Sequence, residues 1–246
     1  MFGFPVFLNV KMSKERFMEP EFKPVADHAL MVGFADKISD AAHAKVIALD
    51  KALATEMPAG MIETVPALVN LLVSFDPVIT DHGAIKAHVL RLLQGLKIER
   101  SHGVRRKIQV CYETPFSTDL NAVATATGLS TDAVINAHLA GDFHVLMYGF
   151  SPGYAYLSGV DTQIQVPRKK AAVRDVPAGS VVIAGPQCLI TTLTMPTGWS
   201  IIGRSPNQIF TGDPNHPFLF DVGDRVTFER IDLMAFESLD QGVKNG

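Results

Sequence analysis

The chain is poor in cysteine and in charged residues, and it lacks the long apolar runs that cross a membrane. Its two cysteines, Cys111 and Cys188, lie inside apolar runs and are too few for a disulfide framework. We therefore expect buried free thiols and a cytoplasmic location. The apolar first ten residues contain a proline and no preceding basic segment, which predicts neither a signal peptide nor a membrane span.

A surplus of either charge is also missing, since 22 Lys and Arg face 25 Asp and Glu for a net charge of −3. No basic arm or stripe exists, which argues against nucleic acid and anionic membranes as partners. The sequence contains no CxxC, no HExxH, no P-loop and no glycine-rich loop that opens a βαβ unit. We therefore expect no metal and no cofactor bound by this chain.

The first half of the chain alternates between strand and helix periodicity. A buried strand is expected at 29–34, a helix capped by Ser39 follows it, and two strands are expected at 61–68 and 70–76. A second helix carries Ile85, Val89 and Leu92 on one face, and residues 106–112 alternate as a last strand. The order β-α-β-β-α-β predicts a ferredoxin-like α/β sandwich.

From residue 143 onward short β-branched runs are separated by turn residues, which predicts a barrel or a sandwich. The expected strands are 143–148, 163–167, 180–184, 189–193, 199–203, 218–221 and 225–231. The predicted organisation is an irregular leader (1–23), a ferredoxin-like α+β domain (24–113), a helical bridge (114–141), a β domain (142–232) and a polar tail (233–246).

One motif in this half matches a serine hydrolase, because Gly149-Phe-Ser151-Pro-Gly153 fits G-x-S-x-G. A nucleophile elbow uses the backbone N–H after the serine as an oxyanion donor. Here that residue is Pro152, which has no N–H and also biases Ser151 toward extended conformations. We therefore expect no serine nucleophile, and we expect Ser151→Ala to leave any activity largely intact.

Three arginines at turns of the β domain are stronger candidates for a site, because a guanidinium offers a planar donor fork to a carboxylate or phosphate. Each one alone could instead form an ordinary surface salt bridge. Gln187 could add amide hydrogen bonds, and Trp199 could form either a stacking wall or part of the core. His138 could be a packed residue or could face the site. The candidate catalytic residues are Arg168, Arg174 and His138, and the candidate substrate-binding residues are Gln187, Arg204, Trp199, Tyr148, Pro152 and Gly153.

At these residues the chain resembles the allophanate hydrolase subunit 1 family, also called the carboxyltransferase C/D or kinase A inhibitor family. The resemblance spans roughly residues 25–232. It is carried by Asp27-His-Ala-Leu30, Val110-Cys-Tyr112 with Asp119-Leu120, Ala137-His138, Gly149-Phe-x-Pro-Gly153, Pro167-Arg168 with Arg174, Val176–Val181 with Ala184-Gly185, and Gly198-Trp199 with Gly203-Arg204. Departures at Thr191-Thr192, at Thr197 and along Gly153–Leu157 alter the expected pocket wall.

The resemblance implies an α+β protein, an N-terminal ferredoxin-like domain followed by a cyclophilin-like closed β-barrel. It also implies a subunit 2 type partner (the C-type subunit in a 5-oxoprolinase), with the working site between the two proteins. In a 5-oxoprolinase assembly a lactam-utilisation protein, the A-type subunit, joins them and ATP is used by the complex. Biotin enters only if the system is a urea carboxylase.

Two functions follow from the resemblance. The leading hypothesis is a subunit, inactive alone, of an ATP-dependent 5-oxoprolinase or of a related allophanate/urea-type amide hydrolase or carboxyltransferase. In it the arginines, Gln187 and His138 would orient an acid or amide group and stabilise developing charge. The alternative is a regulatory protein that inhibits a sensor histidine kinase, since one fold serves both functions.

Overall fold

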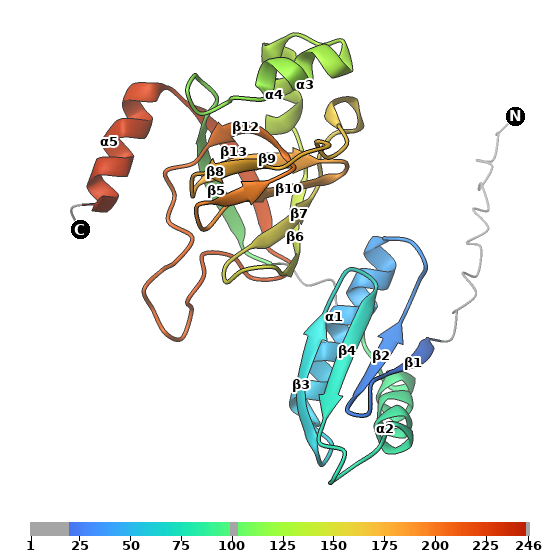
Figure 1. Cartoon of the computed structure of the whole chain (residues 1–246). Coiled ribbons are helices and arrows are strands. Elements are labelled where there is room, and N and C mark those ends of the chain that lie inside the picture. Colours follow the sequence, from blue (N-terminus) through green and yellow to red (C-terminus); the bar gives the residue numbers. More distant parts are fainter. Residues whose placement is uncertain (1–19, 99–102, 245–246) are drawn as a thin grey trace, which may run out of the picture. The chain divides into compact units, whose positions relative to one another are not determined.

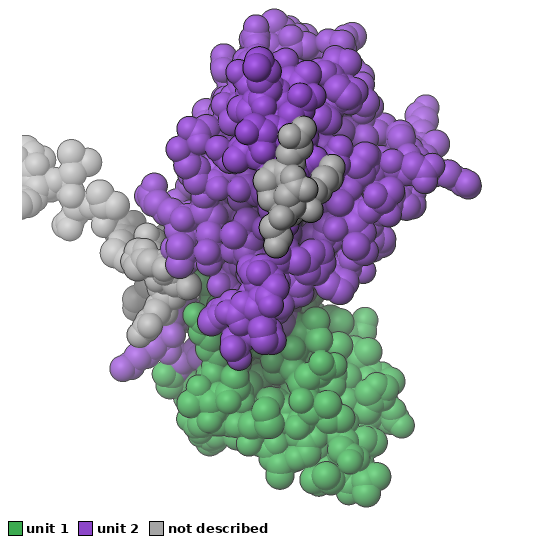
Figure 2. Space-filling view, turned by 90° about the vertical axis from the view of Figure 1, so that its left-hand side faces the viewer, with its two compact units in different colours: residues 1–65, 69–95 green, residues 66–68, 96–246 purple. Residues whose placement is uncertain are grey.

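The computed structural model describes residues 20–98 and 103–244 (Figure 1). Most of the predicted leader therefore lies outside the described residues. The chain forms two compact units, which Figure 2 colours separately. The first runs to Val65 and continues over Val69–Gly95; the second comprises Pro66–Leu68 and everything from Leu96.

The first unit is a four-stranded antiparallel sheet with two helices. Strands β1 (Glu21–Val25), β2 (Ala29–Gly33), β3 (Met61–Pro66) and β4 (Asn70–Phe75) lie in the order β1-β2-β4-β3. Helix α1 (Asp40–Thr55) begins where the Ser39 side chain accepts a hydrogen bond from the amide of Ala42. Asp81 caps α2 (His82–Gln94) in the same way. Both helices bury one apolar stripe, as the 3.6-residue periodicity predicts.

Two strands correct the expected domain. Strand β1 begins within the predicted leader, but it pairs with β2 at the sheet edge, where Pro24 and its missing N–H are tolerated. Strand β5 (Arg105–Cys111), expected to complete the ferredoxin-like unit, instead pairs with β13 and β12 in the second unit. Period-two alternation identifies a strand without identifying its neighbour, and that missing information explains the error.

The second unit is built on a closed seven-stranded barrel of order β10-β7-β6-β13-β5-β12-β9. The other barrel strands are β6 (Phe143–Tyr148), β7 (Ala155–Ser158), β9 (Ser180–Ala184), β10 (Gln187–Ile190), β12 (Ser200–Arg204) and β13 (Arg225–Ile231). Strands β5 and β13 run parallel in register, and the other pairings are antiparallel. The α+β class with a closed barrel is thereby confirmed.

Part of the barrel wall is buried on both faces. Along β9, Val181 and Ile183 point into the barrel core, while Val182 and Ala184 belong to a separate apolar cluster with Leu189. A two-stranded sheet of β8 (Val173–Val176) and β11 (Met195–Thr197) supplies Val176 and Met195 to that cluster. Strands covered on both faces read as continuous apolar runs, which explains the fully buried pattern of β9.

Helices complete the second unit. Helices α3 (Leu120–Thr127) and α4 (Thr131–Leu139), the predicted bridge, pack their apolar faces into the barrel core and so belong to this unit. Residues 233–244, predicted as a polar tail, form helix α5 (Leu233–Lys244). Its Phe236 is 3% exposed and packs against Phe116 with 4.3 Å between ring centroids, so this aromatic contact anchors the helix.

The strand predictions for the barrel are right for β6, β9, β12 and β13, the prediction at 189–193 is displaced from β10 (Gln187–Ile190), and two predictions are wrong. Residues 163–167 contain a single 3-10 turn, η1 (Thr162–Ile164), because Asp161 caps it and accepts from the Gln163 amide. Residues 218–221 contribute one isolated bridge, Phe210 to Phe218. None of the helices in the described part of the chain is long and apolar enough to span a membrane.

His138 lies in the barrel core and not at a site, which settles the alternative that the sequence left open. The imidazole is fully buried against Phe143 and Phe228, and its Nδ1 is 2.8 Å from the Tyr112 hydroxyl. Its Nε2 lies 3.5 Å from the Cys188 sulfur. Both cysteines are free and buried, as predicted. Burial lowers the pKa of His138 to about 3, because charging the ring there forfeits its hydration.

This buried histidine should make the protein sensitive to acid. Folding lowers the pKa of His138, so between pH 6.5 and about 3 this side chain is protonated in the unfolded state and neutral in the folded state. Stability should therefore fall as pH drops below 6.5, by up to about 1.4 kcal/mol per pH unit from this one group. Urea unfolding of wild type and His138→Gln from pH 7 to 4.5 measures the effect. The exposed His216→Gln is the control; identical slopes for His138→Gln and wild type would contradict the assignment.

Candidate functional site

An aromatic pocket opens on the outer side of the barrel wall, beside the β8–β11 sheet. Its volume is about 140 Å³. We call it the aromatic pocket, and its lining residues are Phe150, Tyr154, Tyr156, Arg168, Met195, Pro196, Thr197, Gly198 and Trp199. The same apolar cluster that covers the outer face of the barrel forms its floor, since Tyr154, Met195 and Trp199 belong to both.

The aromatic rings of this pocket form a continuous row. Ring centroids are 5.5 Å apart from Phe150 to Tyr154, 5.6 Å from Tyr154 to Tyr156 and 5.9 Å from Tyr156 to Trp199. The guanidinium of Arg168 lies over the Trp199 ring at 5.4 Å from its centroid. Burial, and next the neighbouring Tyr156, raises the pKa of Tyr154 to about 12, so this phenol stays neutral at physiological pH. The row ends in one cation held by stacking.

The position of Arg168 is fixed by the residue that follows it. The Lys169 ammonium lies 2.6 Å from Oδ2 of Asp119, and this same oxygen accepts a 2.8 Å hydrogen bond from the Ile201 amide. The Lys169 amide donates to the Gly198 carbonyl beside Trp199. Arg168 itself is exposed and forms no salt bridge with any described residue. Lys169 therefore neutralises the nearby acid, and the guanidinium donors of Arg168 have no salt-bridge partner among the described residues.

The loop 149–154 borders the pocket and carries a strained residue. Phe150 has φ +71°, a left-handed backbone conformation that costs about 1–3 kcal/mol for a residue other than glycine. Its side chain is 77% exposed. The Pro152 carbonyl accepts from the Thr192 hydroxyl, which holds the loop against the barrel. The Ser151 hydroxyl oxygen is buried without a hydrogen-bond partner among the described residues, whereas an activated serine requires an adjacent base.

Arg204, expected to share a site with Arg168, lines a different cavity. This Arg204 pocket has a volume of about 340 Å³ and includes Thr191, Thr192, Asn207 and Asp240. The Nε of Arg204 donates to the Ala178 carbonyl at 3.1 Å, and its guanidinium stacks near Phe116 and Phe236. These contacts join β12 to α5. Arg204 therefore uses part of its hydrogen-bonding capacity within the protein and stabilises the fold.

The remaining predicted site residues are dispersed. Arg174 is exposed on β8, next to the strand that lines the aromatic pocket, and Gln187 pairs with Ala184 at a barrel turn. The Tyr148 hydroxyl donates to the Phe220 carbonyl, and burial raises the pKa of this phenol. Pro152 and Gly153 lie in the loop; Gly153 is buried with φ +71°, and a Cβ there would come 3.1 Å from the Phe218 ring. Of the nine predicted residues, the structure brings Arg168 and Trp199 together in one pocket.

The predicted site residues omit the rest of the pocket, although Thr197 and the segment Gly153–Leu157 were expected to alter the pocket wall. Tyr154 and Tyr156 are two residues apart at the start of β7, so period-two alternation places both on the face opposite Ala155 and Leu157. That spacing was a usable signal. The Asp119–Lys169 ion pair joins residues 50 positions apart, and nothing in the sequence indicates their contact.

The Asp119–Lys169 ion pair should be measurably stabilising. Asp119→Ala removes two hydrogen bonds to a charged acceptor and leaves the Ile201 amide unpaired, so we expect a loss of about 3 kcal/mol in unfolding free energy. Lys169→Met removes one partner from a site about one-fifth exposed and should cost about 1 kcal/mol. Chemical denaturation measures both. Equal losses in the two variants would contradict a carboxylate that serves two donors.

Comparisons with known proteins place this chain in a family. The model of the carboxyltransferase domain, subdomain C and D, matches residues 20–220. The chain is similar to the B-type subunit of 5-oxoprolinase from Bacillus subtilis (strain 168), with 33% identity over 224 residues that cover 86% of this chain and 92% of the relative. A conserved uncharacterized protein from Pyrococcus horikoshii is 38% identical with a TM-score of 0.52, and the match covers 88% of this chain and all of that one.

A more distant structural match supports the fold alone. The Kluyveromyces lactis urea carboxylase is 15% identical with a TM-score of 0.77, and the match covers 92% of this chain but 23% of that one. The chain also spans 40% of a longer protein of known structure to which it is 33% identical. The residues that the family model matches include most of the barrel, the loop 149–154 and the aromatic pocket. This chain belongs to the family of carboxyltransferase domains, subdomain C and D.

Proposed function

We propose that this chain is a non-autonomous subunit of an ATP-dependent amidohydrolase of the 5-oxoprolinase type, working in the cytoplasm with a subunit 2 type partner and a lactam-utilisation protein. The complex would open the lactam of 5-oxoproline to yield glutamate. The main support is the similarity to a B-type subunit of 5-oxoprolinase across 92% of that relative. The related allophanate and urea-type reactions share the chemistry of attack at an amide or urea carbonyl.

The aromatic pocket supplies the substrate-binding half of this proposal. A planar guanidinium held over Trp199 suits the bidentate capture of a carboxylate, and 5-oxoproline carries one. The row of rings beside it offers an apolar wall for the ring of the lactam. Because stacking and the neighbouring Lys169–Asp119 pair hold Arg168 in place, little freedom would be lost on binding.

The chemical half of the reaction is assigned to the partners. The lining residues hold one cation and two phenols, and burial raises the pKa of one phenol, Tyr154, to about 12. Among these described residues there is no carboxylate, histidine or thiol that could act as a general base. In this proposal the base and the ATP-handling groups come from the other subunits, and biotin would be used only by a urea carboxylase-type partner.

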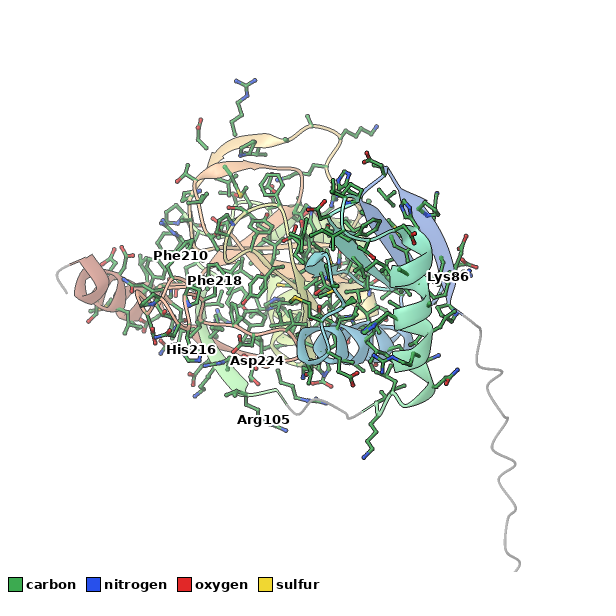
Figure 3. All side chains as sticks on the ribbon, turned by 90° about the horizontal axis from the view of Figure 1, so that it is seen from below. Lys86, Arg105, Phe210, His216, Phe218 and Asp224 are labelled. Atoms are coloured by element: carbon green, nitrogen blue, oxygen red, sulfur yellow. The ribbon has the colours of Figure 1, made fainter. Side chains whose placement is uncertain are left out.

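Arg168 should therefore control turnover by the assembled complex. We expect Arg168→Ala to lower kcat/KM for 5-oxoproline by about 100-fold, since a charge-assisted bidentate contact is lost, and Arg168→Lys to retain part of the activity. The assay is ATP-dependent glutamate release by this chain co-expressed with both partners. Arg105→Ala is the matched control (Figure 3). Arg105 is exposed on β5 and pairs with Arg225 of β13, which pairs with His144 at the end of β6 opposite the loop 149–154.

The same assay separates the two functions that the family carries. Turnover by the complex and none by the chain alone supports the proposal. Unchanged kcat/KM for Arg168→Ala would remove the aromatic pocket from the substrate site. No turnover by the intact complex, together with inhibition of a sensor histidine kinase by this chain alone, would favour the regulatory function.

A further inference from the structure

Phe150 presents an apolar side chain to solvent at the tip of the loop 149–154. It is 77% exposed, and its one ring contact is to Tyr154 within the described residues. Its backbone is left-handed, a conformation that Asn or Gly would adopt at lower cost. Residues kept in such conformations cluster at functional sites. The exposed ring contributes little to the folding stability of this unit. We therefore expect it to bury its surface when another molecule binds.

Exposed cations without salt bridges lie on the segments around the aromatic pocket. Arg168 and Phe150 line the same pocket, and Arg174 lies on β8, whose Val173 pairs with Thr197 of the pocket wall. Lys170 is also exposed. No salt bridge to a described residue is formed by Arg168, by Lys170 or by Arg174. Phe150 and Arg168 thus place an aromatic side chain and a cation without a salt bridge at one pocket, and Arg174 lies on the neighbouring strand beside the exposed Asp175. This surface is complementary to an apolar cavity that carries a carboxylate.

The exposure of Phe150 favours a protein as the partner of this surface. Phe150 lines the aromatic pocket but is still 77% exposed, so most of its side chain remains for a partner to cover. Aromatic residues and arginines dominate the centres of protein interfaces, and they are the residue types present here.

We propose that the loop 149–154 is the docking element for an acidic protein partner, with Phe150 as the anchor that enters an apolar cavity and Arg174, on the strand beside the pocket wall, as a nearby cation. Because it rests on the proposed function, the partner is the subunit 2 type protein. Docking there would place the partner over the mouth of the aromatic pocket. The strained loop is then preorganised for the complex.

Binding of this chain to the purified subunit 2 type protein from the same genome, measured by calorimetry without ATP or substrate, tests the docking element. Phe150→Asn removes the anchor but accepts the left-handed backbone; we expect roughly 30-fold weaker binding, with a melting temperature equal to or a few degrees above wild type. Phe150→Leu should bind between the two. Phe210→Ala, an exposed phenylalanine that packs on Phe218 beside the Arg204 pocket, is the control and should bind normally.

Charge is tested in the same experiment. Arg174→Glu should weaken binding roughly 10-fold at low salt, Arg105→Glu should not, and wild-type affinity should fall as salt rises. Wild-type affinity of Phe150→Asn, an absence of salt dependence, or no binding by the wild type would overturn the docking element. If the binding test fails but the assembled complex still turns over 5-oxoproline, the docking element is wrong and the proposed function stands. If Phe150 is required for binding but the complex has no turnover, the proposed function is wrong and the docking element stands.

Discussion

The two-sided burial of the barrel wall is the constraint from which the site follows. Strands β9, β10 and β12 place one set of side chains in the barrel and the alternate set under the β8–β11 sheet. The outer set cannot face water without exposing a large apolar surface, so the chain must fold a second small sheet over it. The aromatic pocket lies where this cover meets the barrel, with Trp199 and Tyr154 as parts of the same cluster.

Charge placement then separates structure from recognition. Asp119 satisfies Lys169 and the Ile201 amide at once, which ties α3, β12 and the segment after η1 together. Arg204 is used in part by the Ala178 carbonyl and by two phenylalanine rings. Arg168 is stacked but unpaired among the described residues, and that difference makes it the arginine suited to an external acid. Arginines that look equivalent in sequence therefore have different surroundings.

Much of the fold could be predicted from local sequence, because helix caps and periodicity are local. Ser39, the apolar face of α1 and the runs of β2 and β4 were all visible in this way. Partners were not: β5 reads as a regular strand, yet only the closed barrel determines that β13 and β12 flank it. Likewise His138 could not be assigned to the core until its contacts with Phe143 and Phe228 were known. Predicting the pocket required both local sequence signals and the identity of tertiary neighbours, and only the first can be read from the sequence. For this reason two of the nine predicted residues meet there.

The central claim is that the aromatic pocket is half of a substrate site, complete only in a complex. Trp199 is the single tryptophan of this chain and lies in the pocket under Arg168, so 5-fluorotryptophan labelling gives one reporter at the site. The most direct measurement is the 19F NMR signal of the labelled chain, alone and bound to unlabelled partner subunits, during titration with 5-oxoproline. We predict a saturable shift in the complex and none in the isolated chain. Saturation by the isolated chain, or an unmoved signal in a complex that turns over, would contradict the account.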